Sequence, residues 1–252
     1  MSTASPPADV AGDTPPHQVG VIVVAAGGSR RMGGVDKIFT PILGIPLIAH
    51  TLDQFEAFPL VSEVVLVLAP DNLERGACLA RDRGYRKVSH ICPGGERRQD
   101  SVRRGLERLA PCQWVIVHDG ARPNLDPQML QRGLAAAQEC GAAVAGVPVQ
   151  DTVKVVAAQG LVEATPPRDT LWAAQTPQIF RYDLLWEAHR RCTEPVTDDA
   201  AMVERLGHPV KMFLGSYHNL KVTTPLDLAI AEVLLRGRIE GLPPSTGPCR
   251  SN

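Results

Sequence analysis

A glycine-rich segment that carries three cationic side chains follows the first apolar run of the chain. Residues 21–37 read VIVVAAGGSRRMGGVDK. Small residues let backbone N–H groups come close to phosphate oxygens, and Arg30, Arg31 and Lys37 can neutralise the remaining charge. The segment therefore predicts a loop that binds a triphosphate, although an ordinary strand-to-helix turn can be equally rich in glycine. Its spacing excludes the G-x-G-x-x-G dinucleotide fingerprint and the P-loop motif.

A carboxylate stands at the end of another apolar run. In residues 116–123, IVHDGARP, Asp119 follows the run and precedes Arg122 by three positions. Magnesium bound with a nucleotide takes one or two protein carboxylates and completes its shell with phosphates and water, so Asp119 is a candidate Mg²⁺ ligand. A carboxylate that only caps the strand end is the alternative. His118 has no second histidine at ligand spacing, and we interpret it as structural.

Two further loops are suited to the same chemistry. Residues 94–101, GGERRQDS, combine a glycine turn with the start of a predicted helix, whose dipole, backbone amides and Ser101 could meet a ribose, a base or a phosphate. Residues 219–225, NLKVTTP, place Lys221 just before the last predicted helix. Each motif is weak by itself, because glycine turns before helices and surface lysines are both common.

The alternation of apolar runs and amphipathic stretches indicates the elements that position these residues. Strands are expected at 19–25, 63–69, 86–90, 113–118 and 141–148, and helices at 46–58, 71–83, 98–110 and 126–140. This order predicts an α/β fold that is Rossmann-like, with a mostly parallel sheet flanked by helices. Asp71 is the expected N-cap of the second helix. Ligands of such sheets bind at the carboxyl ends of the strands, so the loops 26–37, 92–101 and 119–123 are expected to form one crevice.

The pattern changes after residue 148. Residues 150–165 carry valines on both sides of a turn at Gln159 and Gly160, which predicts a β-hairpin. An apolar hairpin at this place is typical of a protruding arm that packs on a second subunit of a homodimer, and a hairpin that covers its own sheet is the alternative. The remaining elements are expected as a strand at 172–179, helices at 183–191 and 198–206, a strand at 210–214 and a helix at 225–236.

Composition narrows the classes of function. The chain has 252 residues, of which 44% are apolar, and its net charge of −1 argues against nucleic acid as a partner. Six scattered cysteines without a Cys-x-x-Cys pair favour reduced thiols and a cytoplasmic location. No run has the length of a membrane span or of a signal-peptide core. We expect a disordered leader at 1–18, a single domain at 19–237 with the arm at about 150–168, and a loose tail at 238–252.

Seven short motifs are spread over residues 19–236. They are VAAG at 24–27 with Arg31, Met32 and Lys37, GGERRQDSV at 94–102, VHDGARP at 117–123, VQDTVK at 149–154, TPQ at 176–178, TDD at 197–199 and NLKVT at 219–223. In identity and order this set resembles the motifs of the 2-C-methyl-D-erythritol 4-phosphate cytidylyltransferase family, the IspD family. The resemblance covers nearly all of the chain that we expect to be ordered.

The resemblance implies a nucleotidyl transfer in the non-mevalonate isoprenoid pathway, in which the phosphate of methylerythritol phosphate attacks the α-phosphorus of CTP and expels pyrophosphate. An anionic phosphate nucleophile needs no side-chain base, so charge neutralisation and positioning, with Mg²⁺, would carry catalysis. The implied catalytic residues are Arg31, Lys37 and Lys221, and the implied metal ligand is Asp119. The implied nucleotide-binding residues are Ala25, Ala26, Gly27, Gly28, Gly94, Arg98, Ser101 and Asp119. The implied substrate-binding residues are Arg122, Thr152, Arg168 and Thr176, with the hairpin as a dimer arm that brings Arg168 toward the partner's site.

Three positions depart from the family pattern. Ser29 stands where the loop often has its second glycine, Asp36 replaces a proline common before the lysine, and His218 lies where an acidic residue often assists metal binding. Two other functions stay open at this point. One is a cytidylyltransferase for another polyol phosphate such as ribitol 5-phosphate, and the other is a non-catalytic nucleotide-binding module, against which the complete set of cations argues.

Overall fold

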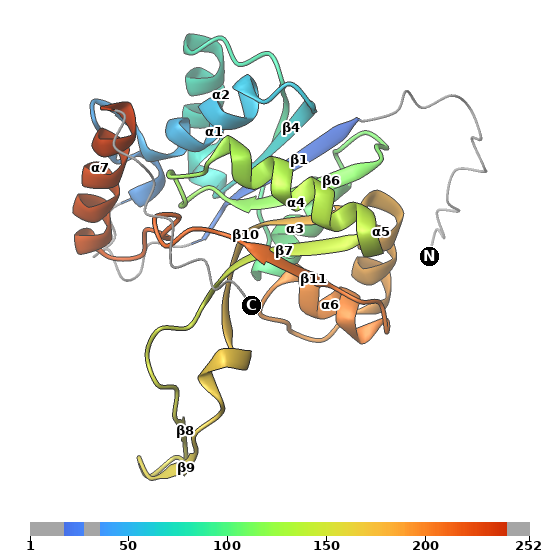
Figure 1. Ribbon diagram of the computed structural model, residues 1–252. Helices are drawn as coiled ribbons and strands as arrows, with labels where there is room; N and C mark the ends of the chain where they lie inside the picture. The colour runs from blue at the N-terminus through green and yellow to red at the C-terminus, as the bar shows by residue number, and fades with distance from the viewer. Residues whose placement is uncertain (1–17, 28–35, 241–252) are drawn as a thin grey trace.

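Seven strands form the central sheet of the computed structural model, which describes residues 18–27 and 36–240 (Figure 1). The strands, in their order across the sheet, are β11 (Lys211–Leu214), β7 (Ala142–Pro148), β10 (Trp172–Arg181), β6 (Trp114–Asp119), β1 (Val19–Ala25), β4 (Val61–Leu68) and β5 (Val88–Pro93). All neighbours are parallel except β10, which is antiparallel to β6 and β7. The predicted mostly parallel α/β fold is confirmed.

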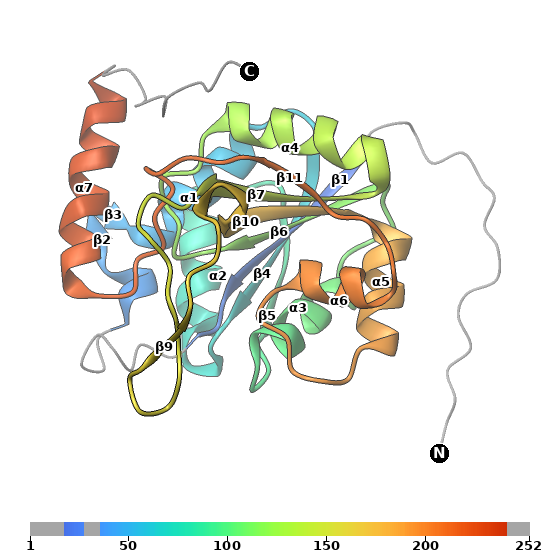
Figure 2. The same cartoon turned by 60° about the horizontal axis from the view of Figure 1, so that its bottom comes forward.

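Helices cover both faces of this sheet (Figure 2). One face is packed by α1 (Leu47–Ala57), α2 (Leu73–Asp82) and α4 (Pro127–Cys140), and the other by α3 (Arg98–Leu106), α5 (Tyr182–Arg191) and α6 (Asp199–Arg205). Strands buried on both faces require continuous apolar runs, and β1, VGVIVVA, is such a run. The parallel register places the carboxyl ends of β1, β4, β5 and β6 at one edge of the sheet, where the sequence predicts the crevice.

The local chemistry of α4 shows why this helix begins and ends where it does. The carboxylate of Asp126 accepts a hydrogen bond from the Gln128 backbone N–H, and Pro127 occupies the first helical position, where a missing N–H costs nothing. Gly141 ends the helix with a φ of 92°, a left-handed conformation that glycine adopts without a Cβ penalty. The helix predicted over 126–140 therefore agrees with the structure within one residue.

A hairpin projects from the body of the protein (Figure 1). Its strands are β8 (Val155–Val156) and β9 (Val162–Ala164), joined through a turn in which Gly160 has a φ of 81°. Val155, Val156, Leu161 and Val162 expose between 42% and 70% of their surface. The protruding hairpin is thus confirmed, and the alternative in which it covers its own sheet is wrong.

Several boundaries differ from the predicted ones for reasons beyond the local sequence. The α2 helix begins at Leu73 after a 3-10 turn, η3 (Pro70–Asn72), so Asp71 is not its cap. The strand expected at 86–90 runs instead over Val88–Pro93, because its parallel partner β4 sets its register. The α3 helix ends at Leu106, four residues earlier than predicted, and in the turn that follows the backbone N–H groups of Arg108 and Leu109 both donate to the Gly105 carbonyl.

The sequence analysis missed one element of the structure and predicted another too short. A small ribbon of β2 (Pro41–Ile42) and β3 (Ile45–Pro46) was not predicted, and it turns at Leu43 and Gly44, which have φ values of 50° and 83°. The last helix, α7 (Pro225–Ile239), extends beyond the predicted end at 236 and packs Ala231 and Leu235 on this ribbon and on α1.

The two expected terminal segments fall mostly outside the described residues. This applies to 1–17 of the predicted leader and to 241–252 of the predicted tail, whereas Gln18 accepts backbone hydrogen bonds from Gln113 and Trp114. Among the helices of the described ranges, none combines the length and apolar character that crossing a membrane requires.

Candidate functional site

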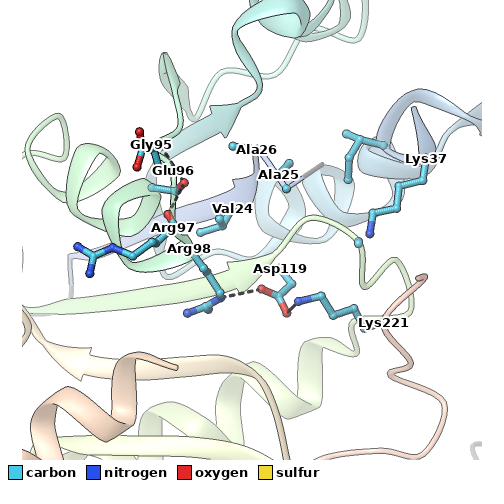
Figure 3. Close-up of a pocket in the computed structure, with 14 residues that line it drawn as sticks. Val24, Ala25, Ala26, Lys37, Gly95, Glu96, Arg97, Arg98, Asp119 and Lys221 are labelled. Atoms are coloured by element: carbon cyan, nitrogen blue, oxygen red, sulfur yellow. Dashed lines mark hydrogen bonds and ion pairs between the residues drawn. The ribbon is translucent and has the colours of Figure 1, made fainter. Parts of the chain in front are cut away.

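A pocket opens at the carboxyl ends of the parallel strands, where the predicted crevice lies (Figure 3). Its lining comes from the end of β1, from the loop before α3, from the end of β6, from the 3-10 turn η2 (Lys37–Phe39) and from the segment before α7. The residues that line it are Val24, Ala25, Ala26, Gly27, Lys37, Ile38, Gly95, Glu96, Arg97, Arg98, Ser101, Asp119, Ala121 and Lys221. We call this cavity the first pocket.

The first two loops touch each other closely at Gly94. A Cβ atom at this position would overlap the Cβ of Ala26 and would lie 2.8 Å from Ser101 Oγ. Ser101 is buried, and its hydroxyl accepts a hydrogen bond from the Gly95 backbone N–H at 3.1 Å and donates to the Arg97 carbonyl at 3.2 Å. Gly94 and Ser101 therefore shape the loop at the start of α3, and Gly95 rather than Gly94 faces the pocket.

Asp119 is surrounded by three cationic side chains (Figure 3 shows two of them). Its Oδ2 lies 2.9 Å from Lys221 Nζ and 3.5 Å from Arg122 Nε, and its Oδ1 lies 3.2 Å from Arg98 Nε. Burial by itself would raise the pKa of this carboxyl, but the charges of Arg98, Lys221 and Arg122 outweigh burial and lower it. Asp119 is therefore an ionised group at the centre of the site.

Lys37 and Lys221 reach the same pocket from opposite ends of the chain. Lys37 Nζ donates to the Val222 carbonyl at 3.1 Å, across 185 positions of sequence. The Val222 backbone N–H in turn donates to the Ala121 carbonyl at 2.8 Å, which ties the Lys221 segment to the loop after β6. Two predicted catalytic lysines and the predicted metal ligand thus share one cavity.

A second pocket adjoins the first and shares Arg98, Asp119 and Lys221 with it. Its other lining residues are Arg122, Ala174, Gln175, Thr176, Gln178, Thr197 and Asp198. Thr176 is buried, and its hydroxyl accepts a hydrogen bond from the Asp119 backbone N–H at 3.0 Å. Arg122 Nη1 donates to the Asn219 carbonyl at 2.7 Å. Arg122 and Thr176, two of the predicted substrate-binding residues, therefore lie beside the first pocket.

The other predicted site residues fall elsewhere. Thr152 and Arg168 lie on the arm and are exposed, outside the described lining of both pockets, and Arg168 Nη1 donates to the Gln150 carbonyl at 2.8 Å. Gly28 and Arg31 lie outside the described residues.

His118 is fully buried beneath the site. Its Nε2 lies 3.3 Å from the Arg122 carbonyl, and its ring makes a T-shaped contact with the ring of Phe55, with the two centroids 5.5 Å apart. Burial lowers its pKa to about 4, so the ring is neutral near pH 7. These contacts agree with the structural interpretation of this histidine.

Several residues of the site were named in motifs but given no role. Gln178, Asp198, Asp199 and Asn219 contribute to the second pocket or to its supports. Asn219 is fully buried, and its Nδ2 donates to the Thr176 carbonyl at 2.8 Å. Their membership in the TPQ, TDD and NLKVT motifs was a signal, but nothing in the local sequence shows what these side chains contact.

The donor set suits a metal that arrives with phosphates. Within the described ranges, no three His, Cys, Asp or Glu side chains gather at metal-binding distance. Asp119 supplies one carboxylate beside a cationic pocket, which fits the usual sharing of Mg²⁺ between one or two carboxylates and the phosphate oxygens of a nucleotide. The residues present therefore fit a nucleotide-borne divalent cation better than a resident one held by protein ligands alone.

Fold and site together define the class of this protein. A Rossmann-like sheet with a glycine-walled, cationic pocket at the carboxyl ends of its parallel strands is typical of enzymes that bind nucleotides. The surplus of fixed cations suits group transfer at phosphorus, in which positioning and charge neutralisation dominate. The class is that of a nucleotidyltransferase.

Comparison with known proteins gives the family. The family model described as IspD, 2-C-methyl-D-erythritol 4-phosphate cytidylyltransferase, matches residues 19–237, and the chain belongs to this family. A relative of that name from Dehalococcoides mccartyi strain 195 is 52% identical over 220 residues, which are 87% of this chain and 97% of the relative. Another from Pelotomaculum thermopropionicum is 46% identical over 228 residues, covering 88% and 95%. The resemblance noted in the sequence is confirmed.

Solved structures agree with this assignment. The 4-diphosphocytidyl-2C-methyl-D-erythritol synthase of Anaerococcus prevotii superposes with a TM-score of 0.77 at 27% identity, covering 86% of this chain and 98% of that one. The 2-C-methyl-D-erythritol 4-phosphate cytidylyltransferase of Thermus thermophilus gives a TM-score of 0.69 at 35% identity, with the same coverage of 86% and 98%.

Proposed function

We propose that this chain transfers the cytidylyl group of CTP to 2-C-methyl-D-erythritol 4-phosphate and releases pyrophosphate, as a step of non-mevalonate isoprenoid synthesis. The observation that carries the proposal is the joining of Lys37, Arg98, Asp119 and Lys221 around one glycine-walled pocket, with a second polar pocket alongside. The first pocket suits the nucleotide, and the second suits the polyol phosphate.

The reaction requires little acid–base catalysis by the protein. A phosphate oxygen of the acceptor forms a bond to the α-phosphorus of CTP while the bond from that phosphorus to the bridging oxygen of pyrophosphate breaks. The nucleophile is already anionic, so the protein must align the two phosphates and neutralise the charge that gathers on the transferred group. The pKa values of His118 and Asp119 are both lowered, which makes the two groups weak proton acceptors and is consistent with a site that needs no general base.

The proposed roles in the first pocket follow from charge and close approach. Lys37 and Lys221 hold the triphosphate and neutralise the transferred phosphoryl group, together with Arg31, which lies outside the described residues and is assigned from the family resemblance. The nucleoside is proposed to lie against the two strand-end loops, at Ala25, Ala26, Gly27 and Ser101, with Gly94 shaping the turn that closes on Ala26 and Arg98 at the wall toward the second pocket. Gly28 is assigned to the nucleoside from the family resemblance alone. Asp119 holds the Mg²⁺ of the Mg–CTP complex. When bound, this ion neutralises phosphate charge and orients the triphosphate.

The proposed acceptor site is the second pocket. Arg122 and Thr176 line it, and Arg122, with 11% of its side chain exposed, supplies a cation for the acceptor phosphate. Thr152 and Arg168 would complete this site from the arm of a second copy of the chain, because in their own chain they are exposed on the arm, outside the described lining of both pockets. We therefore propose a homodimer that is formed through the arm. A cytoplasmic location is proposed from the free cysteines of the described residues.

One assay tests the assignment. Purified protein is incubated with CTP, Mg²⁺ and either methylerythritol phosphate or ribitol 5-phosphate, and pyrophosphate release is measured. We expect turnover with methylerythritol phosphate that exceeds turnover with ribitol 5-phosphate. A preference for ribitol 5-phosphate would overturn the proposed acceptor, and CTP binding without pyrophosphate release for either alcohol would overturn the proposed reaction.

A further inference from the structure

Arg98 is, with Lys221, one of the two cations that belong to the lining of both pockets. Its Nε lies 3.2 Å from Asp119 Oδ1, and its Nη1 lies 2.5 Å from Asp199 Oδ2. Its Nη2 is buried and has no hydrogen-bond partner within residues 18–27 and 36–240. Phosphate oxygens suit the planar geometry of a guanidinium, and Arg98, which leaves 25% of its side chain exposed, lies where a phosphate between the two pockets would meet it.

Asp199, which is in the described lining of neither pocket, holds this guanidinium at Nη1. The residue begins α6 and exposes none of its surface. Its backbone N–H donates to Gln178 Oε1 at 3.2 Å, and Gln178 Nε2 donates to Asp198 Oδ2 at 2.8 Å, so β10 fixes the start of the helix. His189 Nε2 lies 3.5 Å from Asp199 Oδ1. The carboxylate of Asp199 therefore has little freedom to move.

The charge state of the pair follows from its surroundings. Burial would raise the pKa of Asp199, but the charge of Arg98 and the contact with His189 outweigh burial and lower it. Arg98 carries its charge at every pH that the folded protein meets, because the guanidinium group is not deprotonated in proteins. Both groups are thus ionised, and the guanidinium is fixed at two points by two carboxylates.

We infer that Asp199 is a positioning residue for the transfer, which holds Arg98 by Nη1 so that the guanidinium, in the lining of both pockets, meets the phosphoryl group as it passes between them. A donor fixed in advance need not reorganise as charge develops, and this is the main way in which such donors lower a barrier. The inference rests on the proposed function. It assigns contact with the reacting phosphate to Arg98, and to Asp199 an action through Arg98 alone.

The first test separates turnover from nucleotide binding. Asp199→Asn keeps the size of the side chain and removes its charge, and we expect kcat to fall about 10- to 100-fold while KM for CTP changes less than about threefold. Arg98→Lys keeps the charge and loses the forked donor, and it should give the same split. Asp53→Asn is the matched control, because Asp53 pairs with Arg83 at 2.8 Å outside the lining of both pockets. It is expected to lower the melting temperature and to leave kcat unchanged.

A double-mutant cycle then tests whether Asp199 acts through Arg98. If it does, adding Asp199→Asn to Arg98→Gln costs less than about twofold in kcat beyond Arg98→Gln alone, since the partner is already gone. Multiplying losses, or wild-type kcat in Arg98→Lys, would overturn the inference even if Asp199→Asn failed to fold. A wild-type enzyme that released no pyrophosphate would instead contradict the proposed function itself.

Discussion

At the scale of single residues, the site gathers cations that do little for the fold. Lys221 leaves 39% of its side chain exposed and pairs with Asp119, which keeps two arginine partners without it. Partly exposed ion pairs contribute little to stability, typically about 1 kcal/mol or less. We therefore expect Lys221 to lower the activation free energy of the reaction and to add little to the free energy of unfolding.

Replacing either lysine tests this separation. Lys221→Ala or Lys37→Ala should lower kcat/KM by roughly 100-fold or more, because a fixed cation at a developing charge is removed, while unfolding free energy falls by about 1 kcal/mol. Pyrophosphate release and urea unfolding measure the two effects. Lys211→Ala is a matched control, since Lys211 on β11 pairs with Glu139 on α4, outside the described lining of both pockets. Proportional losses of stability and activity in the site variants would contradict the assigned roles.

Residue types and strand ends were enough to find part of this site. Lys37 and Asp119 follow apolar runs, where ligands of α/β sheets bind, and could be chosen without any comparison. Lys221 gained a role only through the family resemblance. Asp199 could not be chosen for its contact, because its partner Arg98 lies 101 positions away and only the folded chain brings the two together.

At the scale of elements, the close contact of two strand-end loops shapes the nucleotide pocket. Gly94 follows β5, and its missing side chain leaves the space that Ala26 and Ser101 occupy. The Gly94 backbone N–H also donates to the Leu68 carbonyl at the end of β4, which fixes the loop to the sheet. The absence of a side chain at Gly94 thus sets the distance between the loop after β1 and the loop after β5. The hydrogen bond to Leu68 keeps the second of these loops in place.

Adding one methyl group here should widen or distort the pocket. For Gly94→Ala we expect an increase of about 10-fold in the dissociation constant for CTP, because overpacking by a carbon atom typically costs about 1–3 kcal/mol. Calorimetric titration of CTP measures the change. The second substitution Ala26→Gly removes the nearest obstacle and should restore part of the affinity, although Ser101 Oγ would remain 2.8 Å from the new carbon. Unchanged CTP affinity in Gly94→Ala would show that the loops separate without cost.

The ribbon of β2 and β3 depends on a histidine of α1. His50 is buried, and its Nε2 donates to the Ile42 carbonyl at 2.9 Å. Burial lowers its pKa below 6.5, opposed by that bond and by Asp53, while Arg238 and Arg83 act in the same direction as burial. The folded protein therefore binds this proton less readily than the unfolded chain.

The sign of the pH dependence follows from that difference. Below pH 6.5 the unfolded chain takes up a proton that folded His50 resists, so the stability contributed by the neutral ring is complete above this pH and is lost as the pH falls. His50→Gln removes the titration and should reduce the loss of unfolding free energy between pH 7 and about pH 5. Urea unfolding at several pH values measures it. Identical pH profiles for the two proteins would rule out a contribution from His50.

The elements also show which parts of a fold a sequence can indicate. Runs such as VGVIVVA and the capped α4 carry their own signals, and both agree with the structure to within a residue. The ribbon is too short for a periodic pattern, and the register of β5 is set by its pairing with β4. The strand β10 runs antiparallel to both of its neighbours, β6 and β7. The sequence of β10 alone does not encode this direction.

At the scale of the whole molecule, the arm carries apolar side chains that its own chain leaves uncovered. Val155, Val156, Leu161 and Val162 are exposed on a hairpin that stands away from the sheet (Figure 1). Contiguous exposed apolar surface on a protruding element is typical of an interface. Sedimentation at micromolar concentration is expected to give a dimer, and Val156→Asp with Leu161→Asp should shift it to a monomer, because unpaired carboxylates would be buried in the interface.

Mixing two inactive variants tests whether the arm completes a neighbouring site. Lys221→Ala damages the pocket in the body of the chain, whereas Arg168→Ala damages only what the arm supplies. In a mixed dimer, one site combines an intact Lys221 with an intact Arg168 from the partner, and the other site lacks both. If random exchange makes half of the dimers mixed, activity should recover to about a quarter of the wild-type value, since one active site in four is whole. If Arg168 served its own chain, every site would keep one defect, and mixing would restore nothing.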